Sequence, residues 1–293
     1  MTQKARPLST VNPPVIDDAN LHVVTARQNF CDYVRSLIDN RHYIRAEARS
    51  GAFSSGRNTY LGRLWLILDP ILQVSVYVVV FGLILQTSRG IDNFVGFLTL
   101  GVIFFRFLSR GITSGNDLVR RSRPTTSTFN LAAVSAVVSV TYKHFLDNLA
   151  PAFVAVALAL MLQLEKPLTW ALLLLPILYF LIHLFNFGAA CLAAQATSAI
   201  PDLRSVINLV TRCLFFVSGV FFSVDKFDTV PALQQVIECN PIYQFLQSVR
   251  LIVLDGVSPD LDTWLYLVSW SLGISFVGFV TFWLSEERLK SGN

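Results

Sequence analysis

Long apolar blocks dominate the pattern of hydrophobic and polar positions along the chain. Twenty residues at 1.5 Å per residue extend about 30 Å, the thickness of the hydrocarbon core of a bilayer. The pattern therefore predicts an all-α integral membrane fold with six transmembrane helices. In chain order they are expected at Leu64–Leu85, Asn93–Ile112, Phe145–Leu164 (the upper part of a longer helix from about Ala132), Leu168–Ala196, Leu203–Phe222 and Thr263–Leu284.

The segment before the first block has a different pattern. Residues 1–20 contain three prolines and a pair of aspartates, which is typical of a disordered tail. Apolar residues from Phe30 to Ile38 then recur at helical spacing on one face, which predicts an amphipathic helix over about Thr25–Arg49. Its arginines Arg35, Arg41 and Arg45 favour a helix that lies on the anionic inner surface of a membrane. The alternative is a helix that binds a partner protein or packs on the bundle. Residues 21–59 are thus expected to hold an interface helix and a linker, with a glycine- and serine-rich loop over Ser50–Thr59.

Two short apolar segments, each too short to cross a membrane, lie between the fifth and sixth blocks. Pro231–Cys239 and Pro241–Leu254 both begin with proline, which favours the first turn of a helix, and Asn240 is a suitable cap for the second. A re-entrant helical hairpin over about residues 229–255 is the favoured interpretation, since non-helical backbone at membrane depth requires a protein or water-filled surrounding. Two amphipathic helices on the outer surface are the alternative.

Composition and charge support a membrane protein and add its orientation. Of the 293 residues, 53% are hydrophobic and 14% charged, which excludes disorder, a coiled coil and most soluble folds. Of the 23 Lys and Arg residues, 18 fall in segments on one side of the predicted membrane and four on the other, with Arg106 inside a span. Positive charge collects on the cytoplasmic side, so both termini are expected to be cytoplasmic in a multi-pass protein of the plasma membrane. The same asymmetry accounts for the excess of basic residues, so we expect no nucleic-acid partner.

Signatures of enzymatic and nucleotide chemistry are missing from the sequence. It contains no GxxxxGK[ST] phosphate loop, no HExxH and no GxSxG, and its four cysteines form no CxxC pair. We therefore expect no catalytic residue, metal site or cofactor in this chain. Asp69 lies early in the first span and is expected to pair with Arg63 or Arg106, or to act in gating. Arg106 is expected to reach the inner headgroups, or to meet an anionic ligand.

Several motifs together resemble a known family. Tyr60 to Trp65 followed by Leu68 to Leu72, Gly115-Asn116 through Arg120-Arg121, Ser218 to Phe222, and Asn240 to Tyr243 with Arg250 resemble the permeases of the ABC-2 type. More narrowly, they resemble the Wzm-like exporters of O-antigen, capsule, teichoic acid and mycobacterial-type galactan. The resemblance covers the chain from about Phe30 to its C-terminus and implies an ABC-2 transmembrane domain over residues 60–293.

The resemblance also implies a division of labour. Two copies of this chain would form a channel, two copies of a separate cytoplasmic ABC ATPase would supply the energy with ATP and Mg²⁺, and a lipid-diphosphate-linked glycan would be the substrate. A coupling helix at about residues 115–130 would enter the ATPase, and the amphipathic helix would gate the inner leaflet. The candidate residues are, for coupling, Asn116, Asp117, Arg120, Arg121 and Arg123; for the gate and interface, Arg35, Arg41, Arg45, Tyr60 and Trp65; and for the channel lining, Tyr77, Phe81, Phe104, Phe105, Phe215, Phe216 and Phe221.

These expectations favour export of a lipid-linked polysaccharide, with an actinobacterial galactan as one candidate cargo. An ABC-2 exporter of a drug or small lipid is an alternative within transport. A membrane-embedded glycosyltransferase is an alternative from another class, in which Asp255, Asp260 or Asp262 would act as catalytic acids, although a solvated acidic loop explains these residues more simply.

Overall fold

The computed structural model describes residues 29–54, 64–80, 93–129, 131–164, 166–224 and 231–286, and within these ranges it contains helices and no strand. The all-α prediction is therefore confirmed for the described part of the chain. Its α-helices are α1 (Phe30–Asp39), α2 (Arg41–Ser54), α3 (Trp65–Val78), α4 (Phe94–Ser114), α5 (Leu118–Thr128), α6 (Val134–Asp147), α7 (Leu149–Met161), α8 (Leu175–Ala199), α9 (Leu203–Val217), α10 (Pro231–Glu238), α11 (Pro241–Arg250) and α12 (Leu261–Leu284).

Four helical stretches in the described ranges are long and apolar enough to cross a membrane. They are Phe94–Ser114, Val134–Met161, Trp170–Ala199 and Leu261–Leu284. The second joins α6 and α7 through Asn148. The third begins with a 3₁₀ turn, Trp170–Leu174, and continues as α8 from Leu175, with Pro176 in the first turn of that helix. These four agree closely with the second, third, fourth and sixth apolar blocks of the sequence.

The first and fifth predicted spans are only partly matched. Of Leu64–Leu85, the described part contains α3 and the residues next to it, and residues 81–85 lie outside the described ranges. The fifth span was expected to reach Phe222, but α9 ends at Val217 after 15 residues, because Gly219 takes a left-handed backbone with φ of +65°. A helix of that length extends roughly 22 Å, which is less than the hydrocarbon core.

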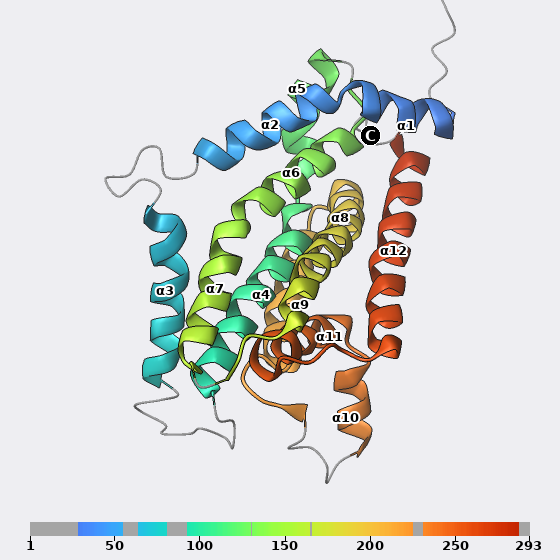
Figure 1. Cartoon of the computed structure of the whole chain (residues 1–293). Coiled ribbons are helices and arrows are strands. Elements are labelled where there is room, and N and C mark those ends of the chain that lie inside the picture. Colours follow the sequence, from blue (N-terminus) through green and yellow to red (C-terminus); the bar gives the residue numbers. More distant parts are fainter. Residues whose placement is uncertain are drawn as a thin grey trace, which may run out of the picture.

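The long helices run side by side, with α4 near the middle of the bundle and α12 packed along α8 (Figure 1). Glycines allow this close approach. A Cβ at Gly188 would lie 2.4 Å from backbone atoms of Ile274, and one at Gly278 would lie 2.6 Å from the carbonyl oxygen of Gly188. Small residues at such contacts are typical of helix pairs inside membranes.

The N-terminal helices lie across one end of this bundle (Figure 1). The sequence predicted one helix from Thr25 to Arg49, and this was wrong in its continuity. Asn40 separates α1 from α2, its side chain donating to the carbonyl of Ser36. The loop predicted from Ser50 was also misplaced, since α2 continues to Ser54. Thr25 and the tail lie outside the described residues.

The two short helices predicted after the fifth span are present as α10 and α11, at the other end of the bundle (Figure 1). Asn240 caps α11 as predicted, because its side-chain oxygen accepts a hydrogen bond from the Ile242 amide at 3.0 Å. A short π-helix, Leu251–Asp255, continues α11. The re-entrant position of this pair stays a prediction.

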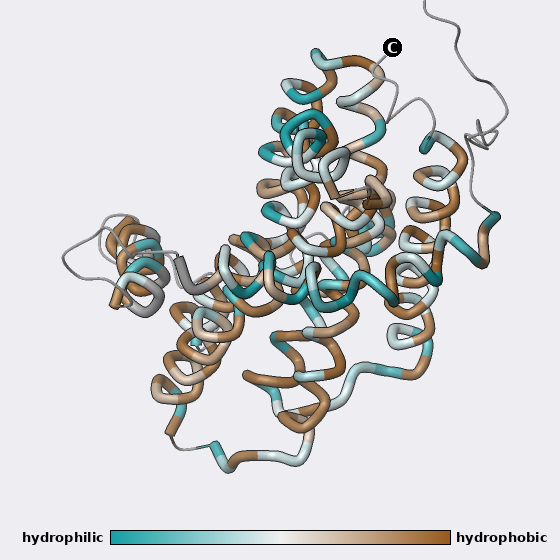
Figure 2. The backbone as a smooth tube through the Cα atoms, turned by 90° about the horizontal axis from the view of Figure 1, so that it is seen from above, coloured by the Kyte–Doolittle hydropathy of each residue, from teal (hydrophilic) through white to brown (hydrophobic). Residues whose placement is uncertain are grey.

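Hydropathy along the backbone agrees with this layout. In the view down the bundle, brown hydrophobic colour predominates along the long helices, while teal hydrophilic colour collects along the helix that crosses the end (Figure 2). Large apolar side chains such as Phe153, Leu173 and Phe276 are exposed on the outside of the bundle. An apolar exterior of this kind suits a surrounding of lipid.

Candidate functional site

The turn between α4 and α5 is the first part of the candidate site. Asp117 adopts a left-handed backbone, with φ of +56°, the single non-glycine residue in the described ranges with a positive φ. Aspartate tolerates this conformation better than most residues because of its short polar side chain. The turn redirects the chain from the buried α4 into the polar α5, and we call the turn residues Gly115 to Asp117 the corner.

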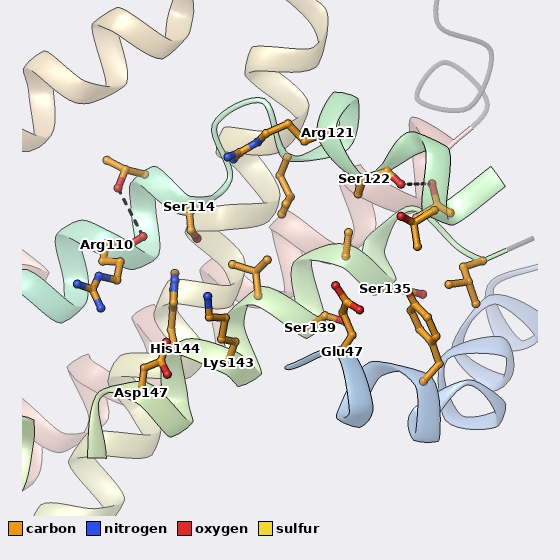
Figure 3. A pocket seen from close by; sticks show the side chains of 18 residues that line it. Glu47, Arg110, Ser114, Arg121, Ser122, Ser135, Ser139, Lys143, His144 and Asp147 are labelled. Carbon is orange, nitrogen blue, oxygen red and sulfur yellow. Dashed lines mark hydrogen bonds between the residues drawn. The ribbon is translucent and has the colours of Figure 1, made fainter. Parts of the chain in front are cut away.

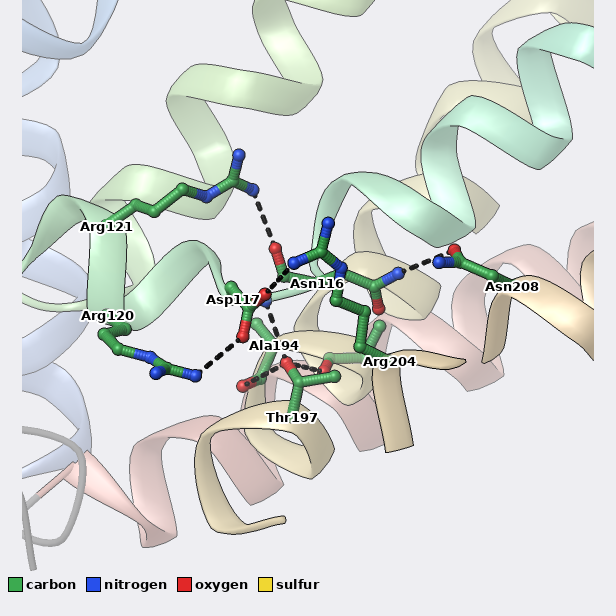
Figure 4. Close-up of polar contacts among 9 residues, drawn as sticks. Asn116, Asp117, Arg120, Arg121, Ala194, Thr197, Arg204 and Asn208 are labelled. Carbon is green, nitrogen blue, oxygen red and sulfur yellow. Dashed lines mark hydrogen bonds and ion pairs between the residues drawn. The ribbon is translucent and has the colours of Figure 1, made fainter. Parts of the chain in front are cut away.

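Asp117 ties the corner to two other helices (Figure 4). Its carboxylate pairs with Arg120 Nη2 at 3.1 Å and with Arg204 Nη1, at the start of α9, at 3.0 Å. Its backbone amide donates to Thr197 Oγ1, near the end of α8, at 3.0 Å. A single residue therefore connects α5, α8 and α9.

Asn116 adds a second link between the corner and α9. Its Nδ2 donates to Asn208 Oδ1 at 3.0 Å, while its carbonyl oxygen accepts from Arg121 Nη2 at 2.7 Å (Figure 4). Gly115 lies so close to α8 that a Cβ there would be 2.2 Å from the Ala190 carbonyl oxygen. A displacement of α5 thus has to move the start of α9 or break these contacts.

Four of the five predicted coupling residues meet here, namely Asn116, Asp117, Arg120 and Arg121. Arg123 lies half-buried farther along α5. The sequence did not indicate Thr197, Arg204 or Asn208 as their partners, because 80 to 92 residues separate the bonded pairs.

A groove between α4 and α9 is the second part of the candidate site. It has a volume of about 500 Å³, and its walls combine aromatic rings with polar groups. The lining residues are Phe105, Ser109, Thr113, Asn208, Thr211, Arg212, Phe215 and Phe216. The ring of Phe215 stands 5.0 Å from that of Phe105 and 4.9 Å from that of Phe221, so these three predicted channel aromatics form one cluster.

The other predicted channel and gate residues are dispersed. Phe104 is fully buried against Phe107, whereas Phe216 is 64% exposed at the edge of the groove. Arg35, Arg41 and Arg45 are exposed on α1 and α2, and Trp65 is exposed at the start of α3. Tyr60, Phe81 and the side chain of Tyr77 lie outside what the structure describes.

Asp69 pairs with Arg106, one of its two predicted partners. Arg106 Nη1 lies 2.6 Å from Asp69 Oδ2, joining α3 to α4, and both side chains are partly exposed. Arg106 therefore has a protein partner, and its reach to the inner headgroups stays a prediction.

Two buried polar side chains, one at each end of the bundle, join segments that are distant in the sequence. The sequence did not indicate the partners of either one. Arg250 is 2% exposed and donates to the carbonyls of Phe97, Gly219 and Val220, with its guanidinium 3.4 Å above the Phe97 ring. At the opposite end, Glu286 accepts from Tyr33 Oη at 2.8 Å and from the Ala133 amide at 3.0 Å. Within the described ranges no three His, Cys, Asp or Glu side chains gather as a metal site would require.

Comparison with known proteins agrees with the resemblance seen in the sequence. The family model of the ABC-2 type transporter matches residues 48–254. The chain is 24% identical to the O-antigen export system permease protein RfbA of Myxococcus xanthus over 240 residues, 80% of this chain and 86% of the relative. It is also 24% identical to the polysialic acid transport protein KpsM of Escherichia coli over 244 residues, 78% of this chain and 88% of the relative. The chain belongs to the ABC-2 type transporter family, and it resembles the permeases of polysaccharide export within it.

Proposed function

We propose that the chain is the permease subunit of an ATP-driven exporter that moves a lipid-linked polysaccharide from the cytoplasmic to the outer face of the plasma membrane. The names of its relatives, which transport O-antigen and polysialic acid, support a polysaccharide cargo. The cargo is of the O-antigen, teichoic acid or galactan class, with an actinobacterial galactan as one candidate.

The observation that carries this proposal is the position of α9. At its start, Arg204 and Asn208 bond to the corner, and two turns later Thr211, Arg212, Phe215 and Phe216 line the groove. A movement imposed on α5 therefore reaches the groove through one helix. Aromatic faces contact the CH groups of sugar rings and require no fixed hydrogen-bond geometry. The neighbouring hydroxyl, amide and guanidinium groups form hydrogen bonds with sugar hydroxyls.

The same proposal includes the partners. Two copies of this chain form the channel, and two copies of a cytoplasmic ABC ATPase, each with ATP and Mg²⁺, bind at the end where α2 and α5 lie. Both termini are cytoplasmic. The exposed apolar side of α9, with Val206, Leu209 and Val210, supports a second copy facing it. The amphipathic α1 and α2 lie at the inner leaflet, and α10 and α11 close the outer end.

Reconstitution tests the proposal. The chain is purified together with a candidate cytoplasmic ABC ATPase and placed in vesicles with a lipid-linked glycan. We expect the glycan to raise ATP hydrolysis and to become accessible to a glycosidase on the far side only when ATP is present. Phe216→Ala in the groove is expected to lower glycan transport severalfold, whereas the matched Phe153→Ala, on the exposed outside of α7, should not.

The alternatives predict other outcomes. If drugs or small lipids, but not the glycan, stimulate hydrolysis and are moved, the chain is an ABC-2 exporter of a different cargo. If the purified chain alone transfers sugar to an acceptor, it is a glycosyltransferase and the export proposal is wrong.

A further inference from the structure

A second cavity, of about 730 Å³, is lined by residues of α2, α4, α5 and α6 (Figure 3). These helices meet at the end of the bundle that α2 crosses (Figure 1). It shares one wall residue, Thr113, with the groove between α4 and α9 and is otherwise lined by different side chains. Neither the family match nor the relatives' names give it a role. We refer to it as the basic cavity.

One face of α6 supplies much of its wall. Ser135, Ser139, Lys143 and Asp147 are spaced four residues apart, which places them one above another on a helix, and all four line the cavity. Figure 3 shows this row along the wall that α6 forms. The row offers, in order, two hydroxyls, an ammonium and a carboxylate.

Positive charge reaches the cavity from three helices. Arg110 comes from α4, Arg121 from α5 and Lys143 from α6 (Figure 3). None of the three forms an ion pair with another residue of the described ranges. The stem of Lys143 runs along α2, since a Cβ on Gly51 would lie 3.0 Å from Lys143 Cδ.

The two α6 hydroxyls lack the partners that comparable hydroxyls have. Thr113, Ser114 and Thr126, which also line the cavity, donate to carbonyls of their own helices. Ser135 and Ser139 are 1% and 4% exposed, and their Oγ atoms have no hydrogen-bond partner in the described part of the chain. Buried hydroxyls are normally hydrogen-bonded, so these two are positioned to donate to a bound acceptor.

A ligand with several acceptor oxygens and a negative charge satisfies all of these groups at once. We propose that the basic cavity binds the phosphate group of a membrane lipid, with Lys143 and Arg110 neutralising its charge and Ser135 and Ser139 donating to its oxygens. The carboxylates of Glu47 and Asp147 leave the lining with one net positive charge, which suits a phosphate diester or a diphosphate that keeps part of its charge balanced by solvent.

The position of the cavity points to a lipid rather than to a soluble phosphate. Arg110 lies four residues before the end of α4, and Lys143 lies inside the apolar stretch Val134–Met161, so both sit where an apolar helix meets the polar end of the bundle. Headgroups occupy that level of a bilayer. The phosphate can come from a phospholipid of the membrane or from the diphosphate that anchors a glycan to its lipid.

Native mass spectrometry of the delipidated full-length chain tests the inference. The protein is titrated with phosphatidylglycerol, with a polyprenyl diphosphate, and with diacylglycerol of the same acyl chains. We expect binding of at least one phosphate lipid and a weaker binding of diacylglycerol. Lys143→Gln and the pair Ser135→Ala with Ser139→Ala should weaken phosphate-lipid binding about tenfold, because hydrogen bonds to an ionised group are the strong ones.

Matched control variants show whether weaker lipid binding comes from loss of the binding site or from a damaged fold. Lys166→Gln and Ser127→Ala change the same residue types outside the cavity and should bind like the unaltered chain. Lys143→Arg keeps the charge and should restore most of the binding. Preference for phosphatidylglycerol identifies a headgroup of the membrane, and preference for polyprenyl diphosphate identifies the anchor of a cargo. Equal binding of diacylglycerol, or unchanged binding in the Lys143→Gln and double serine variants, overturns the proposal, whatever the outcome of the transport assay.

Discussion

At the scale of single residues, buried polar side chains decide which distant segments meet. Within the part of the chain that the structure describes, Arg250 has no acidic partner. Three carbonyls and an aromatic face hold it, so its charge is stabilised by dipoles from α4 and from the residues after α9. The sequence placed Arg250 in a family-like motif but indicated neither its burial nor its contacts, because its partners are main-chain atoms, which every residue carries.

Tyr33 is expected to contribute to stability through Glu286. The Tyr33 hydroxyl donates to the buried carboxylate of Glu286 and so joins α1 to the segment just after α12. Tyr33→Phe removes this hydrogen bond and should lower the free energy of unfolding by about 1–3 kcal/mol at neutral pH. Denaturant unfolding of the purified chain in detergent measures the change. An unaltered free energy would show that the contact contributes nothing.

The same residue predicts a dependence on pH. Burial, and next the charge of Glu286, raise the pKa of Tyr33 above its ordinary value of 10.0. Below pH 10 the residue is protonated in both the folded and the unfolded chain, so its contribution is fully present. Above pH 10 the unfolded chain releases the proton first, and stability falls by up to about 1.4 kcal/mol per pH unit. The difference between the unaltered chain and Tyr33→Phe should therefore shrink above pH 10, and a constant difference from pH 7 to 11 would contradict this.

At the scale of helices, the apolar blocks predicted the long elements well and the short ones less well. Four blocks became candidate spans because length and hydropathy alone define them. The break at Asn40 involves a side-chain hydrogen bond, and the end of α9 at Val217 precedes a left-handed glycine. Both are local features that leave the apolar pattern unchanged. Periodicity therefore misses such boundaries.

Two glycines of α12 give a direct test of its packing on α8. Gly278→Ala places a methyl group 2.6 Å from the Gly188 carbonyl oxygen, and separating the helices should cost about 1–3 kcal/mol of stability. Gly273→Ala meets nothing within 4 Å and should stabilise the helix by about 0.5–1 kcal/mol. Thermal unfolding in one detergent compares the two variants, and a stable Gly278→Ala protein would show that α8 and α12 do not pack so closely.

The contacts of the corner predict a variant that still hydrolyses ATP with its partner but moves less glycan for each ATP. Asp117→Asn keeps a residue that tolerates the left-handed backbone but loses the charge that pairs with Arg120 and Arg204. We expect a loss of about 1 kcal/mol or less in stability, since the arginines are exposed, and a severalfold fall in glycan moved per ATP hydrolysed. The assay is the ratio of the two rates in vesicles that contain the partner ATPase.

Asp202→Asn is the matched control for that experiment. Asp202 is exposed two residues before Arg204 and makes no ion pair in the described ranges. Its ratio of transport to hydrolysis should equal that of the unaltered chain. Equal ratios in both variants would show that the bonds of Asp117 do not carry movement from α5 to α9.

At the scale of the whole molecule, the sequence indicated candidate residues on one side of each contact in the candidate site and missed the residues on the other side. The candidate coupling residues and the candidate channel aromatics of α4 and α9 were selected from motifs and composition, and the groove brings Phe105, Phe215 and Phe216 together. Their polar neighbours Asn208, Thr211 and Arg212 were not found, and neither was the row of serines on α6. Such residues look ordinary within their own helices, and packing against another helix gives them their surroundings.

The placement of the two ends on opposite sides of a membrane can be tested with the native cysteines. Cys31 is exposed on α1 and Cys239 is exposed between α10 and α11, while Cys191 is buried in α8. If the termini are cytoplasmic, a membrane-impermeant maleimide added to intact spheroplasts of a Cys213→Ser strain should modify Cys239 and leave Cys31 unmodified. Permeabilised cells should show both modified, and Cys191 should react only after denaturation. The lysine and arginine asymmetry of the sequence predicts that the α2 end is cytoplasmic, so labelling of Cys31 from outside would reverse the proposed orientation and place α5 out of reach of the proposed cytoplasmic ATPase.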